Sequence, residues 1–419
     1  MKVAIIGSGI SGNSIAWMLN KSCDIVLYEK NDYIGGHSNT VEILYENKKI
    51  FVDTGFIVYN HKTYPNLKKL FDILNVVTVK SNMSFGVKCD KMEFSVCGIA
   101  GLFADKKNFV NPRFWKMIID IIRFNSYATK FVKRNYQEES ASFNKITLED
   151  FLKKINPGKY FMDYFLLPMA GAIWSCPTNI MLKYPALSFL KFYYNHGLLT
   201  LFNQPQWFSV DGGSINYVKL LTKDFEHKIR KSSKVVSVKK SGDKIIVTDS
   251  SFHNEEFDRV IFANHPDEIL EICKDLSNNT KDLLANFKYQ ENKVILHRDI
   301  NIMPKKRAAW ASWVYNKIGV DSSRISVTYW MNNLQNIDHC YPLFVSLNPN
   351  QEIDKSKIFK NFTYHHPIFD SNAIMAQKKI ESIQAVDNYY FVGAYQGNGF
   401  HEDGIASAVR VAKLFGINF

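Results

Sequence analysis

KVAIIGSGISG, at residues 2–12, is the stretch that decides the fold of this chain. Its first five residues form an apolar run that predicts a short buried strand, and a helix is expected over residues 13–19. Between them, Gly7 permits a tight turn, Gly9 lets backbone approach a pyrophosphate at the helix N-terminus, and Gly12 lets helix and strand pack closely. This order of strand, glycine-rich turn and helix predicts a dinucleotide site.

A second expected strand, residues 24–28, ends in Glu29. An acid at this place accepts hydrogen bonds from a ribose diol and disfavours a 2′-phosphate. The sequence therefore predicts FAD or NAD as the ligand, and not NADP.

Further glycines favour FAD over NAD. Gly35 and Gly36 follow the second strand, where a second loop can pass close to phosphates, with His37 beside them as a part-time cation near neutral pH. Gly55 is a place where backbone can lie against a flat ring. Glycine-rich loops at several separate points fit a long cofactor made of two parts.

The carboxyl end carries a third such site. A strand expected at 389–392 runs into Gly393, and a helix is expected over 405–414. Asp403 is placed to cap this helix, whose free N–H groups would face negative charge on a reduced flavin ring.

Length and composition set broad limits. At 419 residues the chain exceeds the size of one hydrophobic core, so two cores are expected. Its net charge of +12 favours an anionic partner. No zinc finger or helix-turn-helix pattern is present, so nucleic acid is not expected. The six cysteines form no C-x-x-C pair, which predicts reduced thiols in a cytoplasmic protein and no metal site. No stretch of 18 apolar residues occurs, so no transmembrane helix is expected.

Several segments resemble the FAD-dependent amine oxidase superfamily, which includes protoporphyrinogen oxidases and carotenoid desaturases. They are also similar to a narrower family of predicted FAD/NAD-binding proteins, often encoded beside cyclopropane-fatty-acid-synthase-like methyltransferases, and to flavin-dependent desaturases of methylated fatty acids. The segments are GGHSNTV (35–41), VDTGFIVYN (52–60), TYPNL (63–67), NMSF (82–85), AWASW (309–313) and GFHEDG (399–404).

The resemblance implies an α/β fold: a Rossmann-like FAD-binding domain that the chain enters three times, with a mixed α+β substrate domain of the amine oxidase type. The expected FAD-binding parts are residues 1–80, 206–265 and 386–419, and the substrate domain takes residues 81–205 and 266–385. The residues expected at FAD are Gly7, Ser8, Gly9, Ser11, Gly12, Glu29, Lys30, Gly35, Gly36, His37, Ser38, Thr54, Gly55, Phe56, Val235, Ala263, Gly393, Glu402, Asp403, Gly404 and Ile405.

Catalytic candidates come from the same motifs. Many amine oxidases carry a lysine that holds a water near the flavin, and Lys293 lies at about that place; an exposed strand lysine is the equal alternative. The candidate bases are titratable residues in or near the motifs, namely Tyr59, His297, His401 and Glu402. His401 is equally well interpreted as a structural contact to the cofactor. The candidates for the substrate path are Tyr59, Trp174 and Trp310.

Aromatic and basic residues recur at helical spacing over residues 114–134. A helix that packs on the core with a solvated basic face is the favoured interpretation, and a helix lying on an anionic membrane is the alternative.

The leading functional hypothesis is an FAD-dependent oxidoreductase that takes a hydride from a methylated or unsaturated fatty-acyl lipid. The alternatives are an oxidase of small amines, a flavin-bound partner of a lipid methyltransferase, and an NAD-dependent dehydrogenase.

Overall fold

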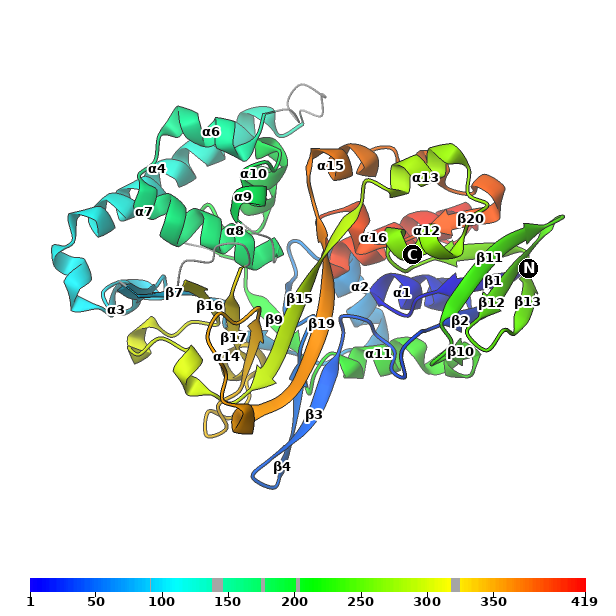
Figure 1. Ribbon diagram of the computed structural model, residues 1–419, viewed down its shortest axis with the longest axis horizontal. Coiled ribbons are helices and arrows are strands. Elements are labelled where there is room, and N and C mark those ends of the chain that lie inside the picture. Colours follow the sequence, from blue (N-terminus) through cyan, green and yellow to red (C-terminus); the bar gives the residue numbers. More distant parts are fainter. Residues whose placement is uncertain (91, 138–145, 175–177, 201–203, 318–324) are drawn as a thin grey trace.

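The computed structural model describes residues 1–90, 92–137, 146–174, 178–200, 204–317 and 325–419. A five-stranded parallel sheet forms one end of the molecule (Figure 1). Its order is β10 (Ile229–Arg230), β2 (Asp24–Tyr28), β1 (Lys2–Ile6), β14 (Arg259–Phe262) and β20 (Tyr389–Phe391). These strands come from three separate stretches of the chain, so the chain enters this sheet three times.

Both faces of the parallel sheet are buried, which explains why its strands are continuous apolar runs. Val3 and Ile5 pack under helices α1 (Ile10–Leu19) and α16 (His401–Leu414). Ala4 and Ile6 face the opposite core. That core is completed by α12 (Pro266–Ile272), α13 (Asn278–Leu284) and an antiparallel sheet of β11 (Val235–Ser241), β12 (Lys244–Asp249) and β13 (Asn254–Phe257).

A second sheet of seven strands forms the other half. Its order is β19 (Ile358–Ile368), β15 (Lys288–His297), β18 (Phe344–Leu347), β17 (Val327–Trp330), β16 (Trp313–Lys317), β7 (Phe85–Cys89) and β8 (Met92–Ser95). The long pair β15 and β19 runs antiparallel through the middle of the molecule, between the two halves (Figure 1).

Smaller elements connect the halves. A hairpin consists of β3 (Thr40–Tyr45) and β4 (Lys48–Asp53), and a short sheet of β5 (Tyr59–Asn60), β9 (Trp207–Val210) and β6 (Thr78–Ser81). The helices of this region are α2 (Pro65–Leu74), α11 (Ile215–Thr222), α14 (Met331–Gln335) and α15 (Ser371–Gln377).

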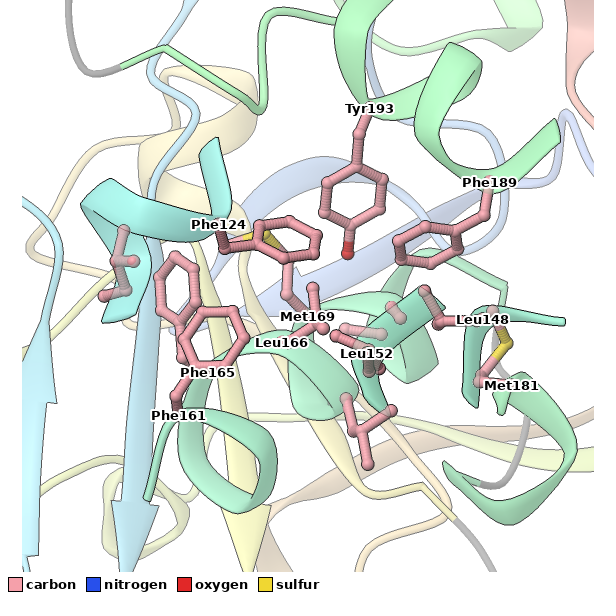
Figure 2. Close-up of a cluster of buried hydrophobic side chains, with 14 of the residues drawn as sticks. Phe124, Leu148, Leu152, Phe161, Phe165, Leu166, Met169, Met181, Phe189 and Tyr193 are labelled. Carbon is pink, nitrogen blue, oxygen red and sulfur yellow. The ribbon is translucent and has the colours of Figure 1, made fainter. Parts of the chain in front are cut away.

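A helical lobe packs against the seven-stranded sheet through one aromatic-rich core (Figures 1 and 2). Its main helices are α4 (Pro112–Asn135), α6 (Leu148–Ile155), α8 (Leu167–Trp174) and α10 (Ala186–Asn195). Helix α4 buries Phe114, Met117, Ile121 and Phe124, so the favoured interpretation of this segment as a core-packing helix is confirmed for that face. Among the described residues, no helix is long and apolar enough to cross a membrane.

Two expected helices begin earlier than predicted. The first starts at Ile10 rather than at residue 13, and the last starts at His401 rather than Ile405. Phe400 is the N-cap residue of α16, and the Asp403 carboxylate accepts a hydrogen bond from its backbone N–H at 2.9 Å. The prediction that Asp403 caps this helix is therefore confirmed, one turn further along the helix than expected.

Tyr193 tests the packing of the lobe. Its hydroxyl points into the apolar cluster between Phe124 and Phe189 (Figure 2) and has no hydrogen-bond partner among the described residues. We expect Tyr193→Phe to raise the free energy of unfolding by about 1 kcal/mol, because it removes an unsatisfied buried hydroxyl. The control is Tyr28→Phe, which removes hydrogen bonds to Glu255 and Arg230 and should be destabilising. Denaturant unfolding measures both, and a loss of stability in Tyr193→Phe would contradict this account.

Candidate functional site

Two glycine-rich loops meet at the N-terminus of α1. Gly9 is the N-cap residue, and no side chain caps the helix. A Cβ on Gly9 would meet nothing within 4 Å, whereas a Cβ on Gly12 would lie 1.8 Å from the carbonyl oxygen of Gly7. A Cβ on Gly36 would lie 3.0 Å from the Gly9 Cα, so the second loop passes directly beside the first. Uncapped N–H groups facing open space are what a phosphate requires.

Glu29 holds the first loop to the end of β2. One carboxylate oxygen accepts hydrogen bonds from the Ser8 backbone N–H at 3.0 Å and its hydroxyl at 2.6 Å. The other oxygen accepts from the backbone N–H and side-chain amide of Asn31, at 2.8 and 2.9 Å. These four donors fill the acceptor sites of the carboxylate. A contact from Glu29 to a ribose stays a prediction, and it requires one of these donors to move.

Three buried polar atoms around these loops lack a partner among the described residues. They are the side-chain oxygens of Asn13 and Asn264 and the Nε2 of His37. Buried polar groups are normally hydrogen-bonded, so such atoms indicate a place for a polar ligand. Together with the open space at Gly9, they fit a bound dinucleotide.

His37 is not the part-time cation that the sequence predicts. Burial, with a smaller effect of His265 and His365, lowers its pKa to about 4. Its ring lies 4.9 Å from that of Tyr364 and 5.3 Å from that of His366, both on β19. In the protein alone, His37 is therefore neutral at physiological pH.

His401 forms a fixed wall beside these loops. Its ring stacks on Phe56 with the centroids 3.7 Å apart, and its Nε2 lies 2.8 Å from the Ser38 hydroxyl. Ser38 also forms a short hydrogen bond to Tyr217. Burial lowers the pKa of His401 to about 3, which makes it a weak base. This geometry favours the structural interpretation of His401 over the catalytic one.

Glu402, on α16, accepts hydrogen bonds from the start of α2. One of its oxygens accepts hydrogen bonds from the backbone N–H and side chain of Asn66, at 3.0 and 2.7 Å, and the other from the Leu67 N–H at 3.0 Å. The carboxylate thus satisfies free N–H groups in the first turn of α2. Its oxygens hold α2 against α16, and the role of Glu402 as a base stays a prediction that requires one of these hydrogen bonds to break.

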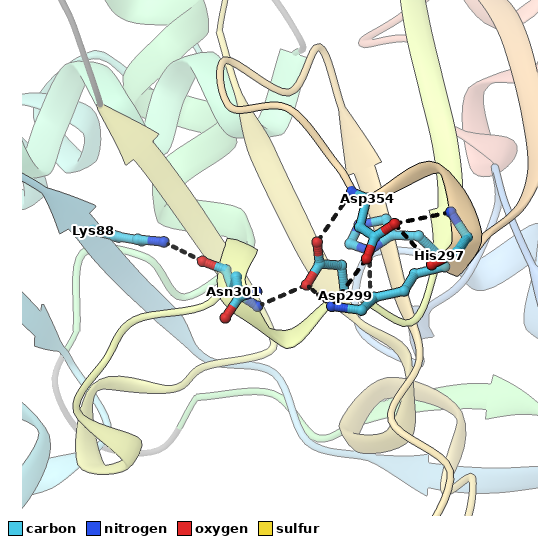
Figure 3. A network of polar contacts seen from close by, with 7 residues as sticks. Lys88, His297, Asp299, Asn301 and Asp354 are labelled. Carbon is cyan, nitrogen blue, oxygen red and sulfur yellow. Dashed lines mark hydrogen bonds and ion pairs between the residues drawn. The ribbon is translucent and has the colours of Figure 1, made fainter.

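The other two strand candidates lie away from this cluster. Lys293 is exposed, whereas its neighbour Asn292 is buried; alternate strand residues point to opposite faces, and Asn292 pairs with Tyr364. The structure thus matches the exposed-lysine alternative. His297 is fully buried at the end of β15, where its Nδ1 accepts a hydrogen bond from the Asp299 N–H (Figure 3). Its Nε2 lies 2.8 Å from the Ser346 hydroxyl. Both ring nitrogens are therefore engaged, and the role of His297 as a base stays a prediction that requires one of these hydrogen bonds to break.

The three aromatic candidates lie in three different hydrophobic clusters. Trp174 packs on Phe192 with centroids 4.6 Å apart, and Phe192 stacks on Phe400 at 5.3 Å, next to His401. Tyr59 is buried in the hydrophobic cluster that also contains Phe56 and Tyr217, with its hydroxyl 3.5 Å from that of Thr78. Trp310 packs on Trp330 and Phe344 in the second sheet, and its prediction as a wall of the substrate path is not supported by these contacts.

Several glycines expected at FAD are required by chain crossings. A Cβ would lie 2.3 Å from the His37 carbonyl oxygen at Gly55, 2.2 Å from the Tyr395 ring at Gly393, and 2.8 Å from the Ser11 hydroxyl at Gly404. The Cβ side of Gly55 is thus filled by backbone and is not open to a flat ring.

The remaining predicted contacts occupy the same half of the molecule. Lys30 forms an ion pair with Glu268 at 2.5 Å. Val235 and Ile405 are buried in apolar cores, and the Ala263 carbonyl lies against Gly7. Their contacts with a cofactor stay predictions.

Sequence reasoning missed Asp53 and the β19 residues. The buried Asp53 carboxylate accepts from the Ser214 N–H at 2.9 Å and the Thr40 hydroxyl at 2.5 Å, and it thereby caps α11. The Tyr364 hydroxyl lies 2.8 Å from both Thr54 and Asn39. An acid inside a buried strand was a usable signal for Asp53, whereas the contacts of Tyr364 depend on tertiary pairing alone.

Known proteins resemble this chain in sequence and in fold. Residues 5–74 match the model of the NAD(P)-binding Rossmann-like domain family. A 1-hydroxycarotenoid 3,4-desaturase of Flavobacterium sp. is 26% identical over 162 residues, a match that spans 36% of this chain and 32% of the relative. A redesigned putrescine oxidase superimposes with a TM-score of 0.72 at 14% identity, covering 98% of each chain. This chain has the amine oxidase fold.

A CLA-producing fatty acid isomerase from P. acnes shares the amine oxidase fold, with a TM-score of 0.68 and 14% identity over 99% of this chain and 98% of its own. The resemblance inferred from the sequence is thus confirmed at the level of the fold. The methyltransferase link stays a prediction.

The two glycines of the first loop give a matched test. Gly9→Ala should fold as the parent does, because its Cβ meets open space, but it should lose retention of a dinucleotide because the methyl group takes the phosphate position. Gly12→Ala should be strongly destabilised, because its Cβ would overlap the Gly7 carbonyl. Thermal unfolding measures the stability of each variant, and the cofactor content after purification measures its retention of a dinucleotide. Full retention of cofactor by a folded Gly9→Ala would contradict the assignment of this site.

Histidines with lowered pKa values predict acid sensitivity of the cofactor-free protein. A folded-state pKa below the ordinary 6.5 means that the folded state binds fewer protons, so the free energy of unfolding falls as pH drops from about 6.5 towards 4, by about 1.4 kcal/mol per histidine per pH unit. Asp53 and Asp403, whose pKa values burial raises to about 6, oppose this trend between about 6 and 3.8. The histidines concerned are His37, His196, His265, His297, His366 and His401.

Denaturant titrations at a series of pH values measure this slope. His366→Gln should reduce the slope of the free energy of unfolding against pH by about 1.4 kcal/mol per pH unit, because it removes one titrating group. Stability independent of pH in this window would show that these histidines do not titrate as described.

Proposed function

We propose that this protein is an FAD-dependent oxidoreductase that oxidises or desaturates a fatty-acyl lipid. The observation that carries the proposal is the convergence of the Gly9 and Gly36 loops at the uncapped N-terminus of α1, within the amine oxidase fold. The Gly9 and Gly36 backbones, with Asn13, Asn264 and His37, would hold the phosphates and neighbouring polar groups of FAD. A bound flavin would supply a two-electron acceptor.

The residues of the chain would position the substrate rather than perform acid–base chemistry. His401, Phe56 and Tyr217 form a rigid, neutral wall, held by hydrogen bonds and stacking. Loss of a hydride from one carbon to the bound flavin, and of a proton from the neighbouring carbon to solvent water, would leave a double bond in the acyl chain. Oxygen or a second redox partner would then take the electrons.

The charges around this wall favour an apolar substrate over an amine. A cationic amine is best held by a free carboxylate. The nearby carboxylates of Asp53, Glu402 and Asp403 are instead engaged by hydrogen bonds from backbone or hydroxyl groups. Trp174, Phe192 and Phe400 lead from the helical lobe to His401 as an aromatic series suited to an acyl chain.

The matched proteins include both substrate classes. The carotenoid desaturase and the fatty acid isomerase are named for apolar substrates, which supports the proposal. Putrescine oxidase is named for an amine, so oxidation of a small amine is the second candidate.

Anaerobic reduction of the flavin tests the proposal. The visible absorbance of the purified protein should show flavin bands, and these should bleach when a monomeric unsaturated or methylated fatty acid is added. A panel of small amines is the comparison under the same conditions. Bleaching by amines alone would move the function to amine oxidation, and bands unchanged by either class would sink the proposed reaction. Purified protein without flavin bands, and without recovery on added FAD, would remove the cofactor assignment.

A further inference from the structure

Helix α4 and the segment before it lie at the end of the molecule remote from the parallel sheet (Figure 1). Their surface carries a stripe of exposed apolar side chains. It is formed by α4 and by the 3-10 turn η1 (Lys106–Val110) that precedes it, next to α3 (Gly98–Leu102). We call this surface the α4 stripe, and its members are Phe109, Val110, Trp115, Ile119 and Ile122, all of which are exposed.

The stripe is continuous along one side of α4. Trp115, Ile119 and Ile122 are spaced four and three residues apart, so they share one helix face. The Trp115 indole N–H donates to the Phe109 carbonyl oxygen at 2.9 Å, which brings η1 against the start of this face. Exposure reaches 83% at Val110 and 55% at Ile119. The opposite face of α4 already fills the core, so packing within the described chain leaves the stripe uncovered.

The stripe is bordered by positive charge. Residues 106–137 contain eight lysines and arginines and one acidic residue, Asp120. Asp120 is buried and accepts from Lys116 at 3.1 Å, from Arg123 at 3.3 Å and from the Gly158 N–H at 2.8 Å. Lys107 and Arg113 are exposed and form no ion pair with a described residue. The surface thus presents apolar groups and uncompensated cations together.

We propose that the α4 stripe docks this protein on an anionic membrane, with the apolar side chains at the acyl boundary and the flanking cations at the headgroups. A helix with aromatic and aliphatic residues beside lysine and arginine is suited to the membrane interface. A protein partner is less well matched, because lysine is depleted at protein interfaces. Docking does not depend on the proposed reaction.

Co-sedimentation of the full-length protein with vesicles tests the proposal. Binding to phosphatidylcholine vesicles that contain phosphatidylglycerol should be strong at low salt, weaker at high salt, and minimal for phosphatidylcholine alone. Two double variants probe the two halves of the surface: Ile119→Ser with Ile122→Ser, and Lys107→Gln with Arg113→Gln. Each should weaken binding by about tenfold or more, from the loss of apolar insertion or of two surface cations.

Matched controls lie on the other half of the molecule. Phe252→Ser removes an apolar side chain that is 82% exposed after β12, and Lys21→Gln with Lys239→Gln removes two exposed cations. These controls should bind as the parent does, and thermal unfolding should show that every variant is folded.

Two outcomes would overturn the membrane assignment. One is that the parent fails to bind anionic vesicles, or that the controls lose binding as much as the stripe variants. The other is a concentration-dependent dimer that Ile119→Ser with Ile122→Ser converts to monomer, without vesicle binding; this would assign the stripe to self-association. Flavin reduction by a monomeric fatty acid needs no vesicle, so failure of docking and failure of the proposed reaction are distinguishable.

Discussion

The close approach of backbone to backbone at the N-terminus of α1 is the constraint on which the rest of the structure depends. Gly12 lies so near the Gly7 carbonyl that a side chain is excluded, and Gly36 lies beside Gly9. The loop, the helix and the second glycine pair can therefore share one small volume and still leave the helix N–H groups open. Gly404 extends the same constraint to the carboxyl end, because it lets α16 pack on Ser11.

Buried carboxylates then fasten segments that are far apart in sequence. Glu29 ties the first loop to β2, Asp53 caps α11, and Glu402 caps α2 from the start of α16. Each carboxylate satisfies backbone N–H groups that would otherwise be unpaired, and this compensates the cost of its burial. The oxygens of these acids are occupied by hydrogen bonds, and the side chains in contact with His401 are the Phe56 ring and the Ser38 hydroxyl. Because the carboxylates are engaged in this way, we propose an acyl substrate rather than a cationic amine.

The two halves of the molecule have different proposed roles. The parallel sheet and its loops form the proposed cofactor site, and the seven-stranded sheet carries the helical lobe on which the aromatic series and the α4 stripe lie. The aromatic series begins in the core of the lobe, and the α4 stripe lies on its outer surface. A lipid substrate would connect these two features, because it would come from a membrane, and a membrane is what the α4 stripe is proposed to bind.

Resemblance to a known superfamily implied the three entries into the parallel sheet. The residues themselves determined the glycine loops, the strand and helix around them and the cap at Asp403. These features are local: glycine spacing, apolar runs and capping residues act within a few positions of each other. The sequence could not assign roles to Glu402, His297 or Lys293, because each role depends on a partner distant in sequence. Only the tertiary structure decided that Glu402 meets the first turn of α2, that His297 is enclosed by Ser346 and Asp299, and that Lys293 faces solvent. Titratable chemistry is set by burial and hydrogen-bond partners, and these arise when separate segments pack together.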